Sequence, residues 1–206
     1  MKYWETLTDA VGLYRTEPYP IHEDALRLAE FSKNKPQDRV IDCGTGNGVL
    51  AVYAEALYGG QFTGIDIDRA ALALAEESAA RNGQAISFQL LSVTDAPAQF
   101  GHGSFDRALM NPPYFTSGDK GARALSRHAD EGLLSDWCHA AFLLLNNGGT
   151  LTLCYPASQL AVLFRALEQN RLAPKRMELL YSGDAARLAL VEAKKLGGDG
   201  MKITRN

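Results

Sequence analysis

The sequence is poor in cysteine and lacks any long run of hydrophobic residues. Its three cysteines, Cys43, Cys138 and Cys154, form an odd set without metal-ligand spacing, so we expect each to be a small buried hydrophobe. The longest apolar runs, such as residues 140–145, are too short to span a bilayer, and residues 1–5 lack the apolar stretch of a signal peptide. These absences predict a cytoplasmic protein with no membrane partner and no metal.

The sequence also lacks a strong excess of charge of either sign. The formal net charge is -3, which gives no general attraction to a polyanion, so a nucleic-acid partner requires a local basic patch. Two clusters qualify, one near residue 120 and one in the C-terminal tail, with Lys120, Arg123, Arg127, His128, Lys194, Lys195, Lys202 and Arg205 as members. An ordinary solvated surface explains these clusters equally well, because acidic residues are interleaved with the first one. The lone histidines His22 and His128 are not expected to bind metal.

Length and composition predict one compact domain. Of the 206 residues, 46% are hydrophobic and 22% are charged, which are ordinary globular values. Folding of such a chain buries about 70% of the surface that the unfolded form exposes. No repeat, low-complexity tract or linker divides the sequence. We therefore expect a single domain over residues 1–206, with residues 1–36 as a helical extension that packs on it.

Short apolar runs alternate with helical stretches along the chain. After a helix that begins near residue 22, we expect strands at residues 39–43, 61–66, 85–91, 105–110, 150–155, 176–181 and 187–193. Helices are expected at residues 49–57, 69–81, 133–145 and 157–169. This alternation is typical of an α/β protein with a mostly parallel sheet and helices on both faces. The short turn at residues 182–184 predicts that the last two strands form an antiparallel hairpin at one edge.

A glycine-rich loop, residues 42–48, follows the first of these strands, at the edge of the sheet where open α/β folds bind ligands. The loop departs from the dinucleotide pattern, because Gly48 comes one residue early and Val49 stands where a pyrophosphate loop has glycine. A carboxylate at Asp42 would repel a pyrophosphate, but it can bind the ammonium group of S-adenosylmethionine. A plain strand-to-helix turn is the alternative interpretation.

Two further aspartates follow the next two strands at the same edge. Asp66 can accept hydrogen bonds from both hydroxyls of a ribose, and Ile67 can pack on an adenine face. Capping of the following helix is an equally good role for Asp66 taken alone, although Asp68 is the better N-cap residue. Asp95 can accept a hydrogen bond from an adenine amino group, or it is a solvated loop aspartate.

The tetrapeptide Asn111-Pro112-Pro113-Tyr114 follows the strand at residues 105–110. Two prolines fix the backbone and leave rigid carbonyl groups. If the side-chain oxygen of Asn111 and the carbonyl of Pro112 accept hydrogen bonds from a planar NH2 group, they orient its nitrogen and stabilise the positive charge that develops during alkylation. Tyr114 can stack on a flat base. The alternative is a Pro-Pro turn beside a packed aromatic ring.

The chain resembles the class I methyltransferases, and within them the small-domain group that carries the N-P-P-Y element. More closely, it resembles the bacterial family that methylates adenine N6 beside the anticodon of a valine tRNA. Four parts of the sequence carry this resemblance: Tyr14-Arg15 with residues 24–29, the loop at residues 42–48, the tetrapeptide at residues 111–114, and residues 122–123 with the tail at 190–194.

The resemblance implies a Rossmann-like, seven-stranded fold that binds S-adenosylmethionine and methylates an amino nitrogen, with tRNA as the expected partner. The implied cofactor-binding residues are Asp42, Gly44, Thr45, Gly46, Asp66, Ile67, Asp95 and Asn111, and the implied catalytic residues are Asn111, Pro112, Pro113 and Tyr114. Similar motifs occur in enzymes that methylate a glutamine amide of release factors or guanine N2 of rRNA. An NAD-dependent oxidoreductase and a non-catalytic nucleotide-binding module are the alternatives from other classes.

Overall fold

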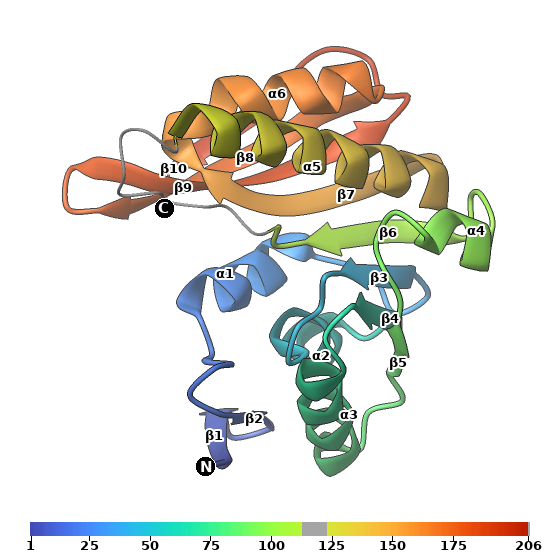
Figure 1. The fold of residues 1–206 in the computed structure, drawn as a ribbon, viewed down its shortest axis with the longest axis vertical. Coiled ribbons are helices and arrows are strands. Elements are labelled where there is room, and N and C mark those ends of the chain that lie inside the picture. Colours follow the sequence, from blue (N-terminus) through green and yellow to red (C-terminus); the bar gives the residue numbers. More distant parts are fainter. Residues whose placement is uncertain (113–122, 206) are drawn as a thin grey trace.

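The computed structural model describes residues 1–112 and 123–205, without the side chains of residues 123–131 and 205. Its centre is an eight-stranded sheet in the order β10-β8-β9-β7-β6-β3-β4-β5 (Figure 1). These strands are β3 (Arg39–Cys43), β4 (Gln61–Asp66), β5 (Ser87–Leu90), β6 (Phe105–Met110), β7 (Leu145–Pro156), β8 (Leu172–Ser182), β9 (Ala185–Lys195) and β10 (Lys202–Arg205).

Most neighbouring strands of the sheet are parallel, and β9 is the antiparallel exception that pairs with both β7 and β8. The structure therefore confirms the α/β class, the mostly parallel sheet and the antiparallel hairpin. Seven strands were expected and the sheet has eight, because β10 adds in parallel to β8 and covers the edge that the hairpin would otherwise form.

Helices cover both faces of the sheet (Figure 1). They are α1 (Glu23–Ser32), α2 (Val49–Tyr58), α3 (Arg69–Asn82), α4 (Ala96–Phe100), α5 (Arg123–Leu144) and α6 (Leu160–Gln169), with a 3-10 turn, η1 (Ala157–Gln159). Alternate strand residues face opposite cores: Ile41 packs in the core under α5 and α6, whereas Val40 packs in the core with α1 and α2. Cys43, Cys138 and Cys154 are free and buried, as expected.

The N-terminal extension is helical only in α1. Strands β1 (Tyr3–Thr8) and β2 (Val11–Arg15) form a separate antiparallel hairpin, so the expectation of a helical extension is wrong for these residues. Hydrogen bonds to α3 hold the hairpin: Gly12 N donates to Asn82 Oδ1 at 3.1 Å, and Tyr14 N donates to Ser78 Oγ at 2.9 Å. That residues 1–206 make one domain stays a prediction. Among the described residues, no helix is long and apolar enough to cross a membrane.

Candidate active site

The glycine-rich loop joins β3 to α2 at the carboxyl edge of the sheet. Gly44, Gly46 and Gly48 all have positive φ, at 73°, 55° and 81°. Two consecutive amides, of Gly44 and Thr45, donate hydrogen bonds to the Ile65 carbonyl at 2.9 Å, which fixes the loop against the end of β4. The left-handed conformation is accessible to glycine at little cost, so the sequence can make this tight path.

Asp42 is buried beneath this loop and only half of its carboxylate is satisfied. Its Oδ2 accepts a hydrogen bond from Thr45 Oγ1 at 2.7 Å, whereas Oδ1 has no hydrogen-bond partner among the described residues. Burial raises the pKa of Asp42 to about 7; the Thr45 hydrogen bond and a weaker backbone interaction with Ala51 oppose this rise, and the charge of Asp66 adds to it. A buried carboxylate with an open oxygen is a favourable partner for a cation.

Asp66 and Asp68 have separate roles at the end of β4. Asp68 caps α3, because its Oδ1 accepts hydrogen bonds from Ala70 N at 2.9 Å and Ala71 N at 3.3 Å. Asp66 instead accepts from Gly46 N at 2.8 Å and from Asp68 N at 2.9 Å. The capping interpretation of Asp66 is therefore wrong, and its carboxylate is held at the cavity described next.

A cavity of about 520 Å³ opens beside the glycine loop. Gly44, Asp66 and Asn111 line it, and its apolar walls include Ile67, Leu91 and Trp137. The Ile67 side chain is available to a ligand, since the residue is 76% exposed. Asp95 does not line this cavity; its neighbours Ser92 and Thr94 do, and Ser92 Oγ donates to Asp95 Oδ2 at 2.7 Å.

A smaller cavity of about 150 Å³ lies on the other side of the loop and includes Asp42, Thr45 and Gly46. Gly44 and Asn111 line both cavities, so they mark the junction between the two. The structure thus brings Asp42, Gly44, Thr45, Gly46, Asp66, Ile67 and Asn111 together at one edge of the sheet.

Asn111 directly follows β6 and supplies a second unsatisfied oxygen at this junction. Its Oδ1 is buried without a hydrogen-bond partner among the described residues. Pro112 is buried next to it. Pro113 and Tyr114, the other two residues of the predicted catalytic tetrapeptide, lie outside the described residues. The structure therefore tests the placement of the first half of the motif only.

Sequence reasoning missed the segment that leads from β2 to α1. The Tyr19 hydroxyl donates to Asp68 Oδ2 at 2.6 Å, and Asn47 Nδ2 donates to the Tyr19 carbonyl at 3.2 Å. These bonds hold Pro20 and His22 at the wall of the smaller cavity. Trp137 was missed as well, because its helical spacing from Leu133 resembles an ordinary core stripe.

Lys194 and Lys195 of the C-terminal basic cluster lie away from the site. Lys194 pairs in register with Thr150, which in turn pairs with Arg107 near the start of β6, at the amino edge of the parallel strands. Lys195 is buried: its Nζ donates to the Leu145 carbonyl at 2.7 Å and lies 4.4 Å from the Phe142 ring centroid, and burial lowers its pKa. The interpretation of Lys195 as a phosphate-binding residue is therefore wrong. Lys120 and the side chains of Arg123, Arg127, His128 and Arg205 lie outside the described residues.

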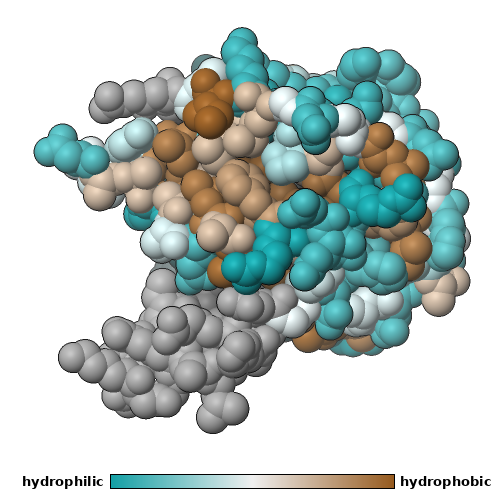
Figure 2. Space-filling view, turned by 90° about the horizontal axis from the view of Figure 1, so that it is seen from above, coloured by the Kyte–Doolittle hydropathy of each residue, from teal (hydrophilic) through white to brown (hydrophobic). Residues whose placement is uncertain are grey.

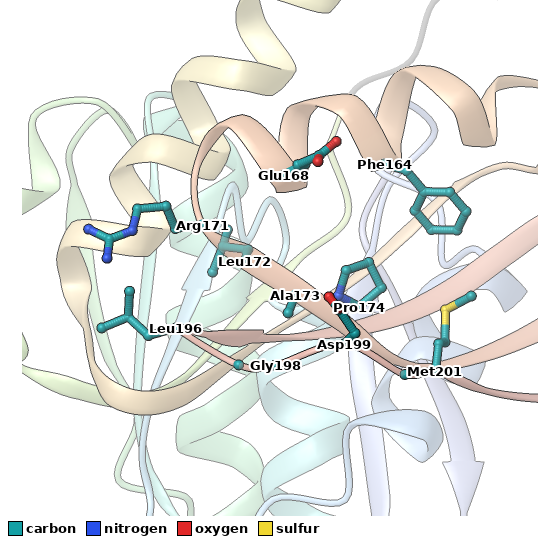
Figure 3. Close-up of a pocket in the computed structure, with 12 residues that line it drawn as sticks. Phe164, Glu168, Arg171, Leu172, Ala173, Pro174, Leu196, Gly198, Asp199 and Met201 are labelled. Atoms are coloured by element: carbon teal, nitrogen blue, oxygen red, sulfur yellow. The ribbon is translucent and has the colours of Figure 1, made fainter.

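A third cavity, of about 610 Å³, lies outside the candidate site, between the end of α6, the start of β8 and the loop before β10 (Figure 3). Phe164, Pro174 and Met201 form apolar walls, and none of the predicted site residues lines it. Hydrophobic side chains also gather in the middle of the face seen from above (Figure 2). The first β8 residues are at the amino edge of the sheet, so we place the candidate site at the glycine loop instead.

No group of three or more potential metal ligands occurs among the described residues. The polar groups that converge at the junction are carboxylate, amide and backbone groups, which suit an organic ligand with cationic and hydroxyl groups. A mostly parallel α/β sheet with a glycine loop and acidic residues at its carboxyl edge places the protein in the Rossmann-like class.

Comparison with known proteins gives the family. The family model of the methyltransferase small domain matches residues 24–160, and the chain belongs to this family. It is 31% identical over 147 residues to a tRNA1(Val) (adenine(37)-N6)-methyltransferase of Vibrio campbellii, and the match covers 68% of this chain and 60% of that relative.

Two solved structures share the fold. The crystal structure of TrmN from Thermus thermophilus matches with a TM-score of 0.69 and 27% identity, over 84% of this chain and 48% of that one. A predicted O-methyltransferase from Agrobacterium tumefaciens matches with a TM-score of 0.71 and 22% identity, over 88% of this chain and 85% of that one. The second likeness concerns the fold alone.

Proposed function

We propose that this protein transfers a methyl group from S-adenosylmethionine to an exocyclic amino nitrogen, namely adenine N6 in a tRNA. One observation carries the proposal: the buried, unpartnered oxygen of Asn111 lies where the two cavities of the site meet. An unsatisfied buried acceptor costs stability, so its retention at a cavity supports a role in binding a donor.

The residues of the site fit the proposed cofactor. Asp42 Oδ1 is an open acceptor for the ammonium group of its amino-acid half. Asp66 lines the larger cavity and can accept hydrogen bonds from ribose hydroxyls, while Ile67 provides an apolar surface for adenine. When bound, the cofactor supplies an electrophilic methyl group on a sulfonium centre.

The protein's contribution to the reaction is orientation of the substrate amine. The nitrogen lone pair of an adenine amino group is delocalised into the ring. Asn111 Oδ1 and the Pro112 carbonyl would accept hydrogen bonds from the two N–H groups and direct the lone pair at the methyl carbon. The same acceptors stabilise positive charge on the nitrogen during transfer. Alkylation makes the remaining N–H acidic, so this scheme needs no strong base.

The choice of tRNA adenine rests on similarity. The Vibrio relative is named for adenine-N6 methylation of tRNA1(Val), and the matched part spans about 60% of its length. A glutamine side-chain amide of a protein and guanine N2 of rRNA are the other amine substrates that the same acceptors could orient. A substrate screen separates these three outcomes.

The test uses the purified full chain with S-adenosylmethionine labelled in its methyl group. Total RNA and total protein from cells that lack the gene are offered in parallel, and labelled RNA is digested to nucleosides for mass spectrometry. We expect label in tRNA as N6-methyladenosine. Label in protein or in N2-methylguanosine would replace adenine as the substrate, and no label in any fraction would contradict the transferase proposal.

A further inference from the structure

Trp137 is an aromatic side chain on the side of α5 that faces the cavity of about 520 Å³. Leu134, Cys138 and Ala141 of this helix are buried in the core, whereas Leu133 and Trp137, one turn apart, line the larger cavity. The indole also contacts the glycine loop: a Cβ built on Gly44 would lie 2.8 Å from Trp137 Cη2 and 3.1 Å from Cζ3. Only glycine at position 44 allows this approach without a shift.

This contact places the indole in the larger cavity beside Gly44, a residue of the junction. Gly44 and Asn111 line both, with Asp42 on one side and Asp66 on the other. The proposed cofactor has its amino-acid half near Asp42 and its adenosine half near Asp66, so the sulfonium centre that links them belongs at this junction. The inference rests on the proposed function, because only that cofactor brings a sulfonium to the site.

We propose that Trp137 is a positioning residue that attracts the sulfonium cation and thereby favours the substrate form of the cofactor over its demethylated product. Indole is the side chain that binds cations most strongly through its π system. S-adenosylhomocysteine carries a neutral thioether at the same place, so this attraction is lost after transfer. The site thus binds S-adenosylmethionine more strongly than S-adenosylhomocysteine, which favours replacement of the product by fresh cofactor between turnovers.

The test compares two cationic ligands with the neutral product by calorimetry. Sinefungin carries an ammonium group in place of the methylsulfonium, and S-adenosylmethionine carries the sulfonium itself. In Trp137→Leu, we expect both to bind about 3- to 10-fold more weakly while S-adenosylhomocysteine affinity stays within about twofold. Trp137→Phe should keep most of the preference, because phenylalanine retains a π face.

Leu133→Ala is the matched control, since this residue lines the same cavity from the same helix without a π system. It should weaken cationic and neutral ligands by the same factor. A second measurement does not depend on substitution of Trp137. The sequence has two tryptophans, and Trp4 lies in β1, so Trp4→Phe leaves Trp137 as the only tryptophan. Its fluorescence should change more with sinefungin than with S-adenosylhomocysteine.

Equal weakening of all three ligands in Trp137→Leu, or equal fluorescence changes, would reduce Trp137 to an apolar wall and overturn this inference alone. Unchanged affinities for all three ligands would overturn it too. Failure of the unaltered protein to bind any of the ligands is a different result, because it contradicts the proposed function as well.

Discussion

Two buried oxygens without hydrogen-bond partners belong to residues of this site. Asp42 lies in β3 and Asn111 directly follows β6, and both residues line the same small cavity. Each unsatisfied buried polar group costs about 1–3 kcal/mol. Other buried atoms are unpaired as well, such as Thr152 Oγ1, but no cavity of the site includes that residue. The coincidence of two acceptors with one cavity favours the binding of donor groups at both positions, as the proposed cofactor and substrate amine would supply.

Asn111→Ala removes the acceptor oxygen from the junction. We expect methyl transfer to slow by about 100-fold or more, because orientation and charge stabilisation of the amine are lost together. Cofactor affinity should change little, since Asp42 and Asp66 remain. Single-turnover kinetics and calorimetry measure the two effects separately. Asn147→Ala, at an exposed asparagine near the start of β7, is the control and should behave as the unaltered protein. Unchanged turnover in Asn111→Ala would remove this residue from the mechanism.

The raised pKa of Asp42, about 7, predicts a pH-dependent cofactor affinity. A bound ammonium group favours the carboxylate form, so binding must displace a proton from Asp42 below pH 7. We expect the Kd for S-adenosylhomocysteine to fall by about tenfold per pH unit between pH 5 and 7 and to level off above that. Calorimetry in buffers of different ionisation enthalpy counts the released proton.

The same pKa shift has the opposite effect on the ligand-free protein. The folded-state pKa of Asp42 is raised above the ordinary value of 3.8, so its contribution to stability is fully present below pH 4 and is lost as the pH rises through about 7. Asp42→Asn should remove both trends, because an amide does not titrate. A pH-dependent Kd that persists in Asp42→Asn would assign the dependence to another group.

The N-terminal hairpin is attached by hydrogen bonds between α3 side chains and its backbone, in addition to the buried apolar side chains of Val11 and Leu13. The side-chain amide of Asn82, the last residue of α3, pairs with the Gly12 backbone as a neighbouring strand's peptide group would. Its Nδ2 donates to the Gly12 carbonyl at 2.8 Å, and its Oδ1 accepts from Gly12 N at 3.1 Å. Gly12 itself packs against Trp4, where a Cβ would lie 2.5 Å from the ring. The segment after the hairpin then reaches the glycine loop through Tyr19 and Asn47.

Asn82→Ala should therefore loosen the hairpin as a unit. The substitution removes both hydrogen bonds to Gly12 and leaves the backbone N–H and C=O of Gly12 without these partners, so we expect the free energy of unfolding to fall by about 1–3 kcal/mol. Hydrogen exchange should quicken at the amides of residues 11–15 and stay unchanged in β3 and β6. The exposed Asn147→Ala again serves as the control. Equal protection of residues 11–15 in both variants would show that other contacts hold the hairpin.

The elements that sequence could predict are those whose residues carry a local signal. Strands such as β3 and β6 are apolar runs followed by turn residues, and Asp68 was correctly predicted as the better cap of α3. The hairpin at residues 3–15 and strand β10 were not predicted, because each depends on contacts with an element elsewhere in the chain. The hairpin depends on Ser78 and Asn82, and β10 depends on β8.

The residues of the candidate site also fall into those that the sequence could predict and those that it could not. Parallel topology brings the residues after β3, β4 and β6 to one edge, so Asp42, Asp66 and Asn111 could be predicted together. Trp137 could not be predicted, because its role depends on contact with Gly44 across the fold. Ser92 and Thr94 line the cavity instead of the predicted Asp95, and this difference depends on the path of one loop.

The whole sheet separates the site from the C-terminal basic residues. The carboxyl edge carries the glycine loop and Asn111, whereas Lys194 and Lys195 lie at the opposite edge. With a net charge of -3, the molecule has no general attraction to RNA. The proposed RNA substrate would therefore have to be held by local contacts near the carboxyl edge, and the C-terminal lysines of β9 would contribute little to its approach to Asn111.

Ligand-dependent stability of the entire chain tests which cofactor the fold accepts. Saturation with S-adenosylhomocysteine at about 100 times its Kd should add about 2.7 kcal/mol to the free energy of unfolding. For a chain of this size each kcal/mol shifts Tm by about 2–4 °C, so we expect a rise of about 5–10 °C in a thermal scan. NAD at the same concentration should leave Tm unchanged, because Gly48 comes one residue early for a pyrophosphate loop and the Asp42 carboxylate repels phosphate. A comparable rise with NAD would make the loop a dinucleotide site, and the assignment of Asp42 to an ammonium group would then fail.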